Sequence, residues 1–142
     1  HPWLTRATQT CCELLAEDAP REAHTLQGAT RLIDSLPDRA LAGRLFDIVA
    51  DTLPKASFYI ADAPTHGYGL TPLHFAPTPT SPWRELFTDD QINGHLDDLA
   101  AKQQPDGGWP VTWAPPGPAA TNEWRGHVTL QAVRTLAAYG RL

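Results

Sequence analysis

Histidine is the residue type in this chain best suited to bind a metal ion or to move a proton near neutral pH. The six histidines are His1, His24, His66, His74, His95 and His127. No two of them are four residues apart, the spacing that places both on one helix face toward zinc. Asp62, His66 and His74 share one loop and could converge there, although such loop histidines more commonly make hydrogen bonds. We therefore expect no metal ion and no cofactor.

The stretch QQPDGGWPVTW, residues 103–113, has the composition of a specific turn. Its motif residues are Gln103, Gln104, Asp106, Gly107, Gly108 and Trp109. The aspartate and the glycine pair can supply a turn with positive φ, which costs glycine little. The tryptophan then folds back, and we expect its ring to lie on the amide plane of either glutamine. The amide groups would bond the backbone ends of a neighbouring helix, so that the motif ties one helix pair to the next.

This part of the chain resembles the QW repeat of squalene cyclases and the related repeats of protein prenyltransferase β-subunits. In each, an outer helix is followed by the pattern Q-x-x-D-G-G-W and then by an inner helix. The likeness is sharpest over residues 99–109, LAAKQQPDGGW, and extends over residues 88–140, whereas residues 3–53 fit only as helical hairpins. It implies an all-α fold, an α/α toroid-like helical repeat. A closed double ring needs about a dozen helices and we expect about five, so either the chain is part of a longer one or two copies combine as a homodimer.

Two aspartate pairs are candidates for the acid chemistry of these enzymes. Class II terpenoid cyclases carry a D-x-D-D motif whose middle aspartate protonates an alkene or epoxide, which requires surroundings that keep the acid protonated. This sequence has Asp89-Asp90 within TDDQ and Asp97-Asp98 within LDDL, and neither is D-x-D-D. We interpret the first pair as helix N-terminal charge and the second as a solvated outer face. The zinc-binding Asp, Cys and His of prenyltransferases have no counterpart around Cys11-Cys12.

Two loop segments rich in Tyr, Phe, Trp and Pro are the most suited to binding: residues 64–77, PTHGYGLTPLHFAP, and residues 107–118, GGWPVTWAPPGP. Such loops form rigid apolar walls that suit an isoprenoid or another flat hydrophobic small molecule, and they equally suit packing over the end of a helical array. A toroid would also turn the first residues of the last helix toward a central cavity. The expected ligand-lining residues are Tyr68, His74, Phe75, Trp113, Trp124 and His127.

Apolar spacing predicts three helices in the first part of the chain. Residues 3–17 carry Leu4, Ala7, Cys11, Leu14 and Leu15, residues 20–36 carry Ala23, Leu26, Thr30, Ile33 and Leu36, and residues 38–53 carry Leu41, Leu45, Ile48 and Thr52. Pro20 suits the first position of the second helix, and Pro54 ends the third. Short links make the three helices antiparallel neighbours.

A long Pro-rich loop, residues 54–87, follows and holds six of the fourteen prolines. We expect it to be ordered because its aromatic and apolar residues are those that disordered segments lack: Phe58, Tyr59, Ile60, Tyr68, Leu70, Leu73, Phe75 and Trp83. Pro77, Pro79 and Pro82 favour extended, polyproline-like geometry. The whole chain, residues 1–142, is expected to form one helical repeat domain.

Two further helices complete the expected fold. Thr88 opens the first by a capping box with Gln91, and its apolar face comprises Ile92, Leu96, Leu99 and Gln103. The last helix runs from Thr121 or Asn122 to about Tyr139, with Gly140 as its stop. It carries few charges, with Arg134 alone between Gly126 and Gly140, so we expect it to be apolar nearly all round and buried on several sides.

The two adjacent cysteines are not expected to bond to each other, because the small ring strains the peptide. We expect Cys11 to be a buried apolar residue and Cys12 to be a free thiol near the surface. Without a disulfide framework, the composition favours a reducing compartment, most simply the cytoplasm.

Charge and composition exclude several classes of function. Eleven Lys and Arg against sixteen Asp and Glu give a net charge of −5, and no cluster of cations occurs, so nucleic acid is not an expected partner. No apolar run approaches the roughly 20 residues of a membrane span. The sequence contains no G-x-S-x-G, P-loop or dinucleotide fingerprint.

Two functions remain open. In the first, the chain is a non-catalytic binding domain that takes a hydrophobic, isoprenoid-like molecule or a protein partner with its aromatic loops. In the second, it belongs to a terpenoid cyclase or prenyltransferase-like enzyme whose catalytic acid lies outside these residues. A carboxylic acid in an apolar cavity beside Trp124 and His127 would favour the enzyme.

Overall fold

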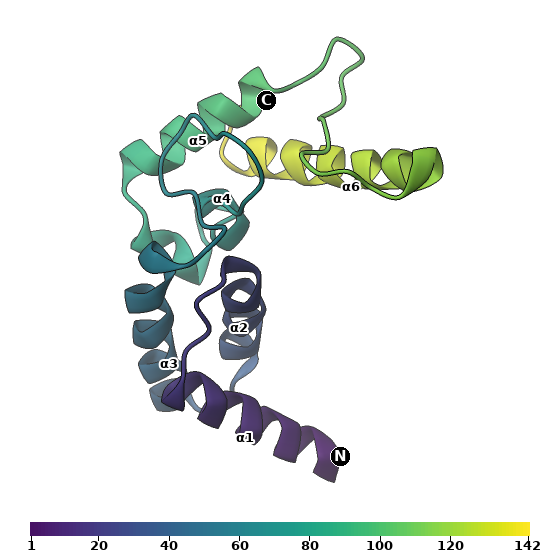
Figure 1. The fold of residues 1–142 in the computed structure, drawn as a ribbon. Helices are drawn as coiled ribbons and strands as arrows, with labels where there is room; N and C mark the ends of the chain where they lie inside the picture. The colour runs from purple at the N-terminus through teal and green to yellow at the C-terminus, as the bar shows by residue number, and fades with distance from the viewer. The chain divides into compact units, whose positions relative to one another are not determined.

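The computed structural model describes all residues from 1 to 142, and the chain is all-α (Figure 1). Its α-helices are α1 (Pro2–Glu17), α2 (Ala23–Ser35), α3 (Arg39–Thr52), α4 (Pro72–Phe75), α5 (Asp89–Ala101) and α6 (Gly117–Ala138). Two short 3-10 helices are η1 (Leu53–Lys55) and η2 (Pro82–Leu86). The helices group into two compact units, residues 1–59 and 60–142. A single domain and a toroid-like arrangement both stay predictions.

In the first unit, α2 buries the face that its sequence predicts. Ala23, Leu26, Thr30 and Ile33 are buried, as is Leu36 directly after the helix. The helix begins later than expected, because Glu22 rather than a residue near Pro20 is its N-cap. The Glu22 carboxylate accepts hydrogen bonds from the backbone amides of His24 and Thr25, at 3.1 and 2.9 Å. The cap therefore fixes the start of α2, and Pro20 stays outside it.

The buried face of α3 is rotated from the predicted one. Ala42, Leu45 and Val49 are buried, whereas Leu41 and Ile48 are half-buried. The sequence offers apolar residues on both sides of Leu45, and packing against α2, which lies beside α3 in Figure 1, selects one of the two sets. Asp38 caps the helix through the amides of Ala40 and Leu41, both at 3.0 Å.

The expected order of the two cysteines is wrong. Cys12 and Leu15 are buried, whereas Cys11 is exposed and Leu14 is 60% exposed. Two adjacent leucines allow two helical stripes, and α1 uses the one through positions 8, 12 and 15 rather than the one through 4, 7, 11 and 14. Burial, followed by the charges of Cys11 and Glu13, raises the pKa of the Cys12 thiol.

The Pro-rich loop is ordered and packed in the second unit as expected, but its backbone is less extended than expected. Its buried residues are Leu70, Pro72, Leu73, Phe75, Ala76, Trp83 and Phe87. Extended geometry at the later prolines is wrong, because Pro79 lies in a turn and Pro82 opens η2. The Ser81 hydroxyl donates to the Phe75 carbonyl at 3.2 Å, which ties that turn to α4.

The capping box of α5 forms as predicted. The Thr88 hydroxyl accepts from the Gln91 amide and the Gln91 side chain accepts from the Thr88 amide, both at 3.1 Å. Ile92 and Leu96 are buried as expected. Gln103 lies beyond the helix and is exposed, and the buried face of α5 includes His95 instead.

The prediction that the last helix is buried on several sides is wrong. α6 starts at Gly117, earlier than expected, and buries only Ala132, Thr135 and Leu136. Its other residues are small or polar, or are apolar without apolar neighbours on the same face. They therefore form no wide apolar stripe that could bury the whole helix. At its C-terminal end the Tyr139 hydroxyl donates to the Ala76 carbonyl at 2.9 Å, which anchors this half to the loop. Neither α6 nor any shorter helix has the apolar length that a membrane crossing needs.

Candidate functional site

In the turn between α5 and α6, one of the two glycines has the positive φ predicted for both. The Gly107 amide donates to the Gln104 carbonyl and the Gln104 amide donates to the Gly108 carbonyl, both at 2.8 Å. Gly107 has a φ of +84°, in the left-handed region that favours glycine, whereas Gly108 does not. Only the first glycine is therefore required for backbone conformation.

Trp109 closes this turn and is the residue that joins the two helices. Its side chain is 3% exposed, and its indole Nε1 donates to the Leu99 carbonyl at 2.7 Å, near the end of α5. Its backbone amide donates to the Thr129 hydroxyl of α6 at 3.0 Å. The tie between successive helices exists, but its polar contacts go to a backbone carbonyl and a threonine.

The two glutamines do not make the hydrogen bonds predicted for them. The Gln103 amide group donates to the Gly107 carbonyl at 3.0 Å, and the Gln104 amide group donates to the Lys102 carbonyl at 3.2 Å. Both acceptors belong to the same turn rather than to a neighbouring helix, and both glutamines are exposed. Their short distance along the chain from these carbonyls favours local bonds.

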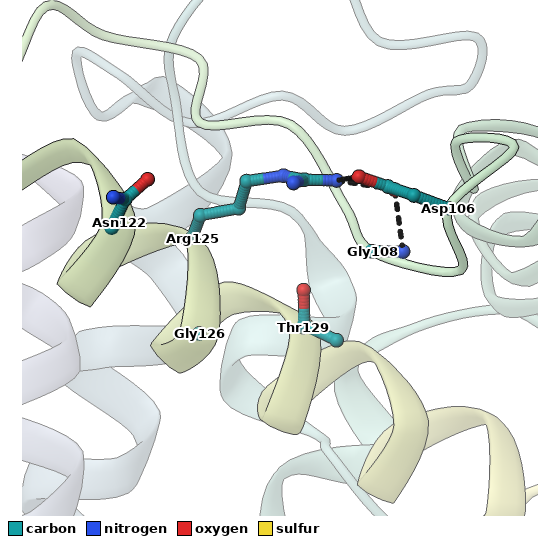
Figure 2. Close-up of a pocket in the computed structure, with 6 residues that line it drawn as sticks. All are labelled: Asp106, Gly108, Asn122, Arg125, Gly126 and Thr129. Carbon is teal, nitrogen blue, oxygen red and sulfur yellow. Dashed lines mark hydrogen bonds and ion pairs between the residues drawn. The ribbon is translucent and has the colours of Figure 1, made fainter. Parts of the chain in front are cut away.

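Asp106 links the turn to α6 by charge (Figure 2). Its carboxylate accepts from the Gly108 amide at 3.1 Å and pairs with the Arg125 guanidinium, with 2.6 Å to Oδ2. These hydrogen bonds, with that from Arg125 the strongest, lower the pKa of Asp106. A Cβ at Gly108 would lie 2.6 Å from an Arg125 nitrogen, so a larger residue there would require the Arg125 side chain to move.

A shallow, open hollow of about 220 Å³ lies beside this ion pair. It is lined by Asp106, Gly108, Asn122, Arg125, Gly126 and Thr129. The Arg125 charge is already matched by Asp106, and the Thr129 hydroxyl is already engaged by Trp109. The hollow therefore offers a ligand few uncommitted polar groups, and it contains none of the predicted ligand-lining residues.

Four of the six predicted ligand-lining residues meet in one row of rings. The centroids of Tyr68 and Trp113 are 5.9 Å apart, those of Trp113 and Trp124 are 5.1 Å apart, and those of Trp124 and His127 are 5.6 Å apart. Successive rings lie at 72°, 80° and 89°, the edge-to-face arrangement that aromatic pairs prefer. We call Tyr68, Trp113, Trp124 and His127 the aromatic ladder.

The aromatic ladder lies at the surface. Tyr68 is 46% exposed, Trp124 is 43% exposed, and His127 is exposed as well. The expectation that Trp124 and His127 face an enclosed central cavity therefore has no support in this geometry. Tyr68 comes from the loop before α4, Trp113 from the loop before α6, and the other two from α6, so the ladder brings together the two loop segments proposed for binding.

The other two predicted lining residues have structural positions. The His74 ring accepts from the Thr71 amide through Nδ1 at 3.0 Å and so closes the capping box of α4. Phe75 is buried, with its ring 6.4 Å from that of Phe87. Neither residue is part of the ladder, because α4 turns them toward its own cap and toward the core.

Three of the four aspartates considered for acid catalysis, Asp89, Asp97 and Asp98, are engaged in ion pairs. Asp89 pairs with Arg84, and Asp97 accepts from Arg141 at 3.1 Å. Burial on its own raises the pKa of Asp98, but hydrogen bonds from Lys102 and Thr65 outweigh it and leave that pKa below its ordinary value. An acid that must hold its proton needs a raised pKa, so Asp98 is unsuited to donate one.

The histidines form no metal centre. No group of three or more His, Cys, Asp or Glu side chains could hold a metal ion, so Asp62, His66 and His74 do not converge on one. His24 pairs with the Glu22 carboxylate at the cap of α2. His95 is 1% exposed, and its Nε2 lies 3.0 Å from the Ala61 carbonyl oxygen.

Sequence reasoning missed His95 as part of the core. Its position three residues after Ile92 and next to Leu96 places it on the apolar face of α5, so helical spacing carried the signal. Its Nδ1 has no hydrogen-bond partner, which is consistent with a ring held in place by packing and by one bond to the loop.

Comparisons with protein-family models, with curated proteins and with solved structures find no match to this chain.

Proposed function

We propose that this chain is a non-catalytic binding protein whose 60–142 unit binds an apolar segment of a partner protein through the aromatic ladder. The observation that carries the proposal is the contiguous row of rings, in which Tyr68 and Trp124 are each nearly half exposed. Tyr and Trp are enriched at protein interfaces because each combines a large apolar surface with a polar group and loses little conformational entropy on binding.

The way in which the ladder is held also supports binding. Thr65 donates to the Asp98 carboxylate through its hydroxyl at 2.7 Å and through its amide at 3.2 Å. Lys102 donates to Asp98 at 2.7 Å and to the Thr65 carbonyl at 3.2 Å. These bonds tie the loop that carries Tyr68 to α5, so the ladder is already in place before any partner arrives, which lowers the entropic cost of binding.

A hydrophobic small molecule fits the site less well than a protein segment does. Small-molecule sites are typically cavities of about 300–1,000 Å³ that enclose most of the ligand. The ladder is an open surface, and the hollow near it is smaller and has Asp106, Arg125, Asn122 and Thr129 in its wall. An isoprenoid lipid laid on the ladder would leave much of its own surface in water.

The kinship with α/α toroid repeats stays part of the proposal. The order of α5, a D-G-G-W turn with a buried tryptophan, and α6 supports it. The local bonds of Gln103 and Gln104 and the exposed face of α6 depart from the pattern that the resemblance implied. The enzyme alternative has the weaker support, since Trp124 and His127 are exposed rather than set in an apolar cavity.

The test compares capture of proteins from the source cell by the wild type, by Tyr68→Ala/Trp124→Ala and by Trp3→Ala. Trp3 is 59% exposed and lies in the other unit, so it controls for the loss of any exposed tryptophan. We expect a partner that the wild type and Trp3→Ala retain and that the ladder variant loses, with the partner then confirmed as a purified protein by calorimetry.

Two results would contradict the proposal. One is equal capture by the ladder variant and the wild type. The other is thermal stabilisation of the wild type by a panel of isoprenoid lipids that Tyr68→Ala/Trp124→Ala abolishes, because a lipid and not a protein would then occupy the ladder.

A further inference from the structure

The unit that carries the aromatic ladder has an excess of unmatched negative charge. Residues 60–142 hold five Lys and Arg against eight Asp and Glu. Four of the five cations form ion pairs, and Arg134 is the one that forms none. The acidic residues outside these pairs are Asp62, Glu85, Asp90 and Glu123.

One of these carboxylates lies next to the ladder. Glu123 is exposed and comes four residues before His127, so the two side chains are neighbours on the surface of α6. At about 100° per residue, His127 lies between Glu123 and Trp124 around the helix axis. Glu123 therefore borders the His127 end of the ladder, and no cation of the chain pairs with it.

The arginines of α6 do not cancel this charge. Arg125 directly follows Trp124, but its guanidinium pairs with Asp106 and extends toward the turn, as Figure 2 shows. Arg134 lies seven residues after His127, which is roughly 10 Å farther along the helix axis. The carboxylate of Glu123 is thus the nearest unmatched charge to the ladder on this helix.

The loops that supply the other two rings add no Lys or Arg. Residues 64–77 carry Tyr68 and residues 107–118 carry Trp113, and neither segment contains a residue of either type. A side chain bound to the ladder therefore meets four rings and, at the α6 end of the row, one unmatched carboxylate.

We infer that the partner segment presents an arginine to the aromatic ladder, an inference that rests on the function proposed above. The guanidinium lies over the exposed Trp124 ring, whose quadrupole attracts a cation, and pairs with Glu123. The apolar stem of the arginine covers ring surface. Apolar residues beside it in the partner segment cover Trp113 and Tyr68.

Arginine fits this surface better than the other classes of side chain do. A purely apolar segment would cover the rings and leave the Glu123 carboxylate partly desolvated without a partner, which costs free energy. An acidic side chain would be repelled by the same carboxylate. The lysine ammonium is a compact, strongly hydrated charge, whereas the guanidinium is planar, more weakly hydrated and stacks on aromatic faces.

The first test is selection of peptides from a random library on the full chain, with Tyr68→Ala/Trp124→Ala as the counter-selection and circular dichroism as the check that it is folded. We expect the retained peptides to share an arginine flanked by apolar residues. Peptides that bind through the ladder but share no arginine would overturn this inference and leave the proposed function intact. A library from which the ladder retains no peptide would contradict both.

The second test removes the charge from a selected peptide. Citrulline keeps the planar shape and the stem of arginine but is neutral, so it separates the attraction of a cation from simple packing. We expect calorimetry to show about tenfold weaker binding of the citrulline peptide. Equal affinity of the two peptides would overturn the inference, because packing alone would then explain the binding.

The third test assigns the pairing to Glu123. Glu123→Gln should weaken the arginine peptide by about threefold and leave the affinity of the citrulline peptide unchanged, as a double-mutant cycle measures. Glu85→Gln, at an exposed and unpaired carboxylate in η2, is the matched control and should change neither affinity. An equal effect of Glu123→Gln on both peptides, or no effect on either, would overturn the inference.

Discussion

Trp109 lies in the loop that leads into α6 and Trp124 lies in α6 itself, and the two tryptophans have different surroundings. Trp109 is 3% exposed and makes two hydrogen bonds, one to α5 and one to α6. Trp124 is 43% exposed, and its contacts are the rings of Trp113 and His127. The same residue type therefore stabilises the fold where its indole N–H has a buried acceptor, and it forms part of the exposed surface where its neighbours are other rings.

The turn should be the more sensitive region to substitution. Trp109→Ala removes a buried ring and leaves the Leu99 carbonyl without its donor. We expect it to lower the free energy of unfolding by about 3–5 kcal/mol, measured by denaturant unfolding. Trp109→Phe should recover most of that loss and retain a deficit of about 1–2 kcal/mol for the missing hydrogen bond. A loss below about 1 kcal/mol for Trp109→Ala would show that the turn does not hold the two helices together.

Substitution of Asp98 should have an intermediate effect on stability, because Asp98 bonds to the loop that carries Tyr68 and not to any aromatic ring. Asp98→Asn should lower the free energy of unfolding by about 1–2 kcal/mol, through weaker bonds to Thr65 and Lys102. The pKa of Asp98 is lowered in the folded chain, so its contribution is present above the ordinary aspartate pKa and is lost as the pH falls through the lower, folded value.

The pH dependence supplies the control for this variant. Denaturant unfolding between neutral and acidic pH should show that Asp98→Asn is less sensitive to acid than the wild type. An unchanged slope in the acid range would mean that Asp98 is not ionised in a stabilising contact.

Trp124→Ala should have a smaller effect on stability and a larger one on binding. The loss of its edge-to-face contacts should lower the free energy of unfolding by about 0.5–1.5 kcal/mol, since half of the ring is already in water. Thermal unfolding measures this. If Trp124→Ala destabilised the chain as much as Trp109→Ala, the ladder would be a core element and not a presented surface.

Gln103→Ala should have the smallest effect. Its side chain is exposed and makes one bond, to the Gly107 carbonyl of its own turn. We expect a loss below about 0.5 kcal/mol in denaturant unfolding. A loss of several times that size would instead favour the inter-helix role that the resemblance implies for this glutamine.

The sequence predicts best those features that depend only on residues close together in the chain. The capping box of Thr88 and Gln91 and the buried face of α2 depend only on neighbouring positions, and both are confirmed. The positive φ at Gly107 is of the same kind.

Features that depend on tertiary contacts were harder to predict. In α1 the adjacent leucines allow two apolar stripes, and only packing within the unit decides between them. The burial of the two cysteines is therefore the reverse of the prediction, with Cys12 buried and Cys11 exposed. The low number of charges in α6 predicts burial, yet the helix has no periodic apolar stripe and only Ala132, Thr135 and Leu136 are buried.

The candidate site was predictable in its residues but not in its geometry. Aromatic composition pointed to Tyr68, Trp113, Trp124 and His127, and the structure brings these four together. The same reasoning could not separate His74, which is used by the cap of α4, from residues that face solvent. Which rings meet depends on where two loops fold, and no local pattern encodes that.

The central claim is that Trp124 presents a binding surface that the fold does not need. It is tested most directly by partner capture with Trp124→Ala, on protein shown by denaturant unfolding to be folded. We expect capture to fall to the level of an empty support while the free energy of unfolding changes by no more than about 1.5 kcal/mol. Capture equal to that of the wild type, on equally stable protein, would contradict it.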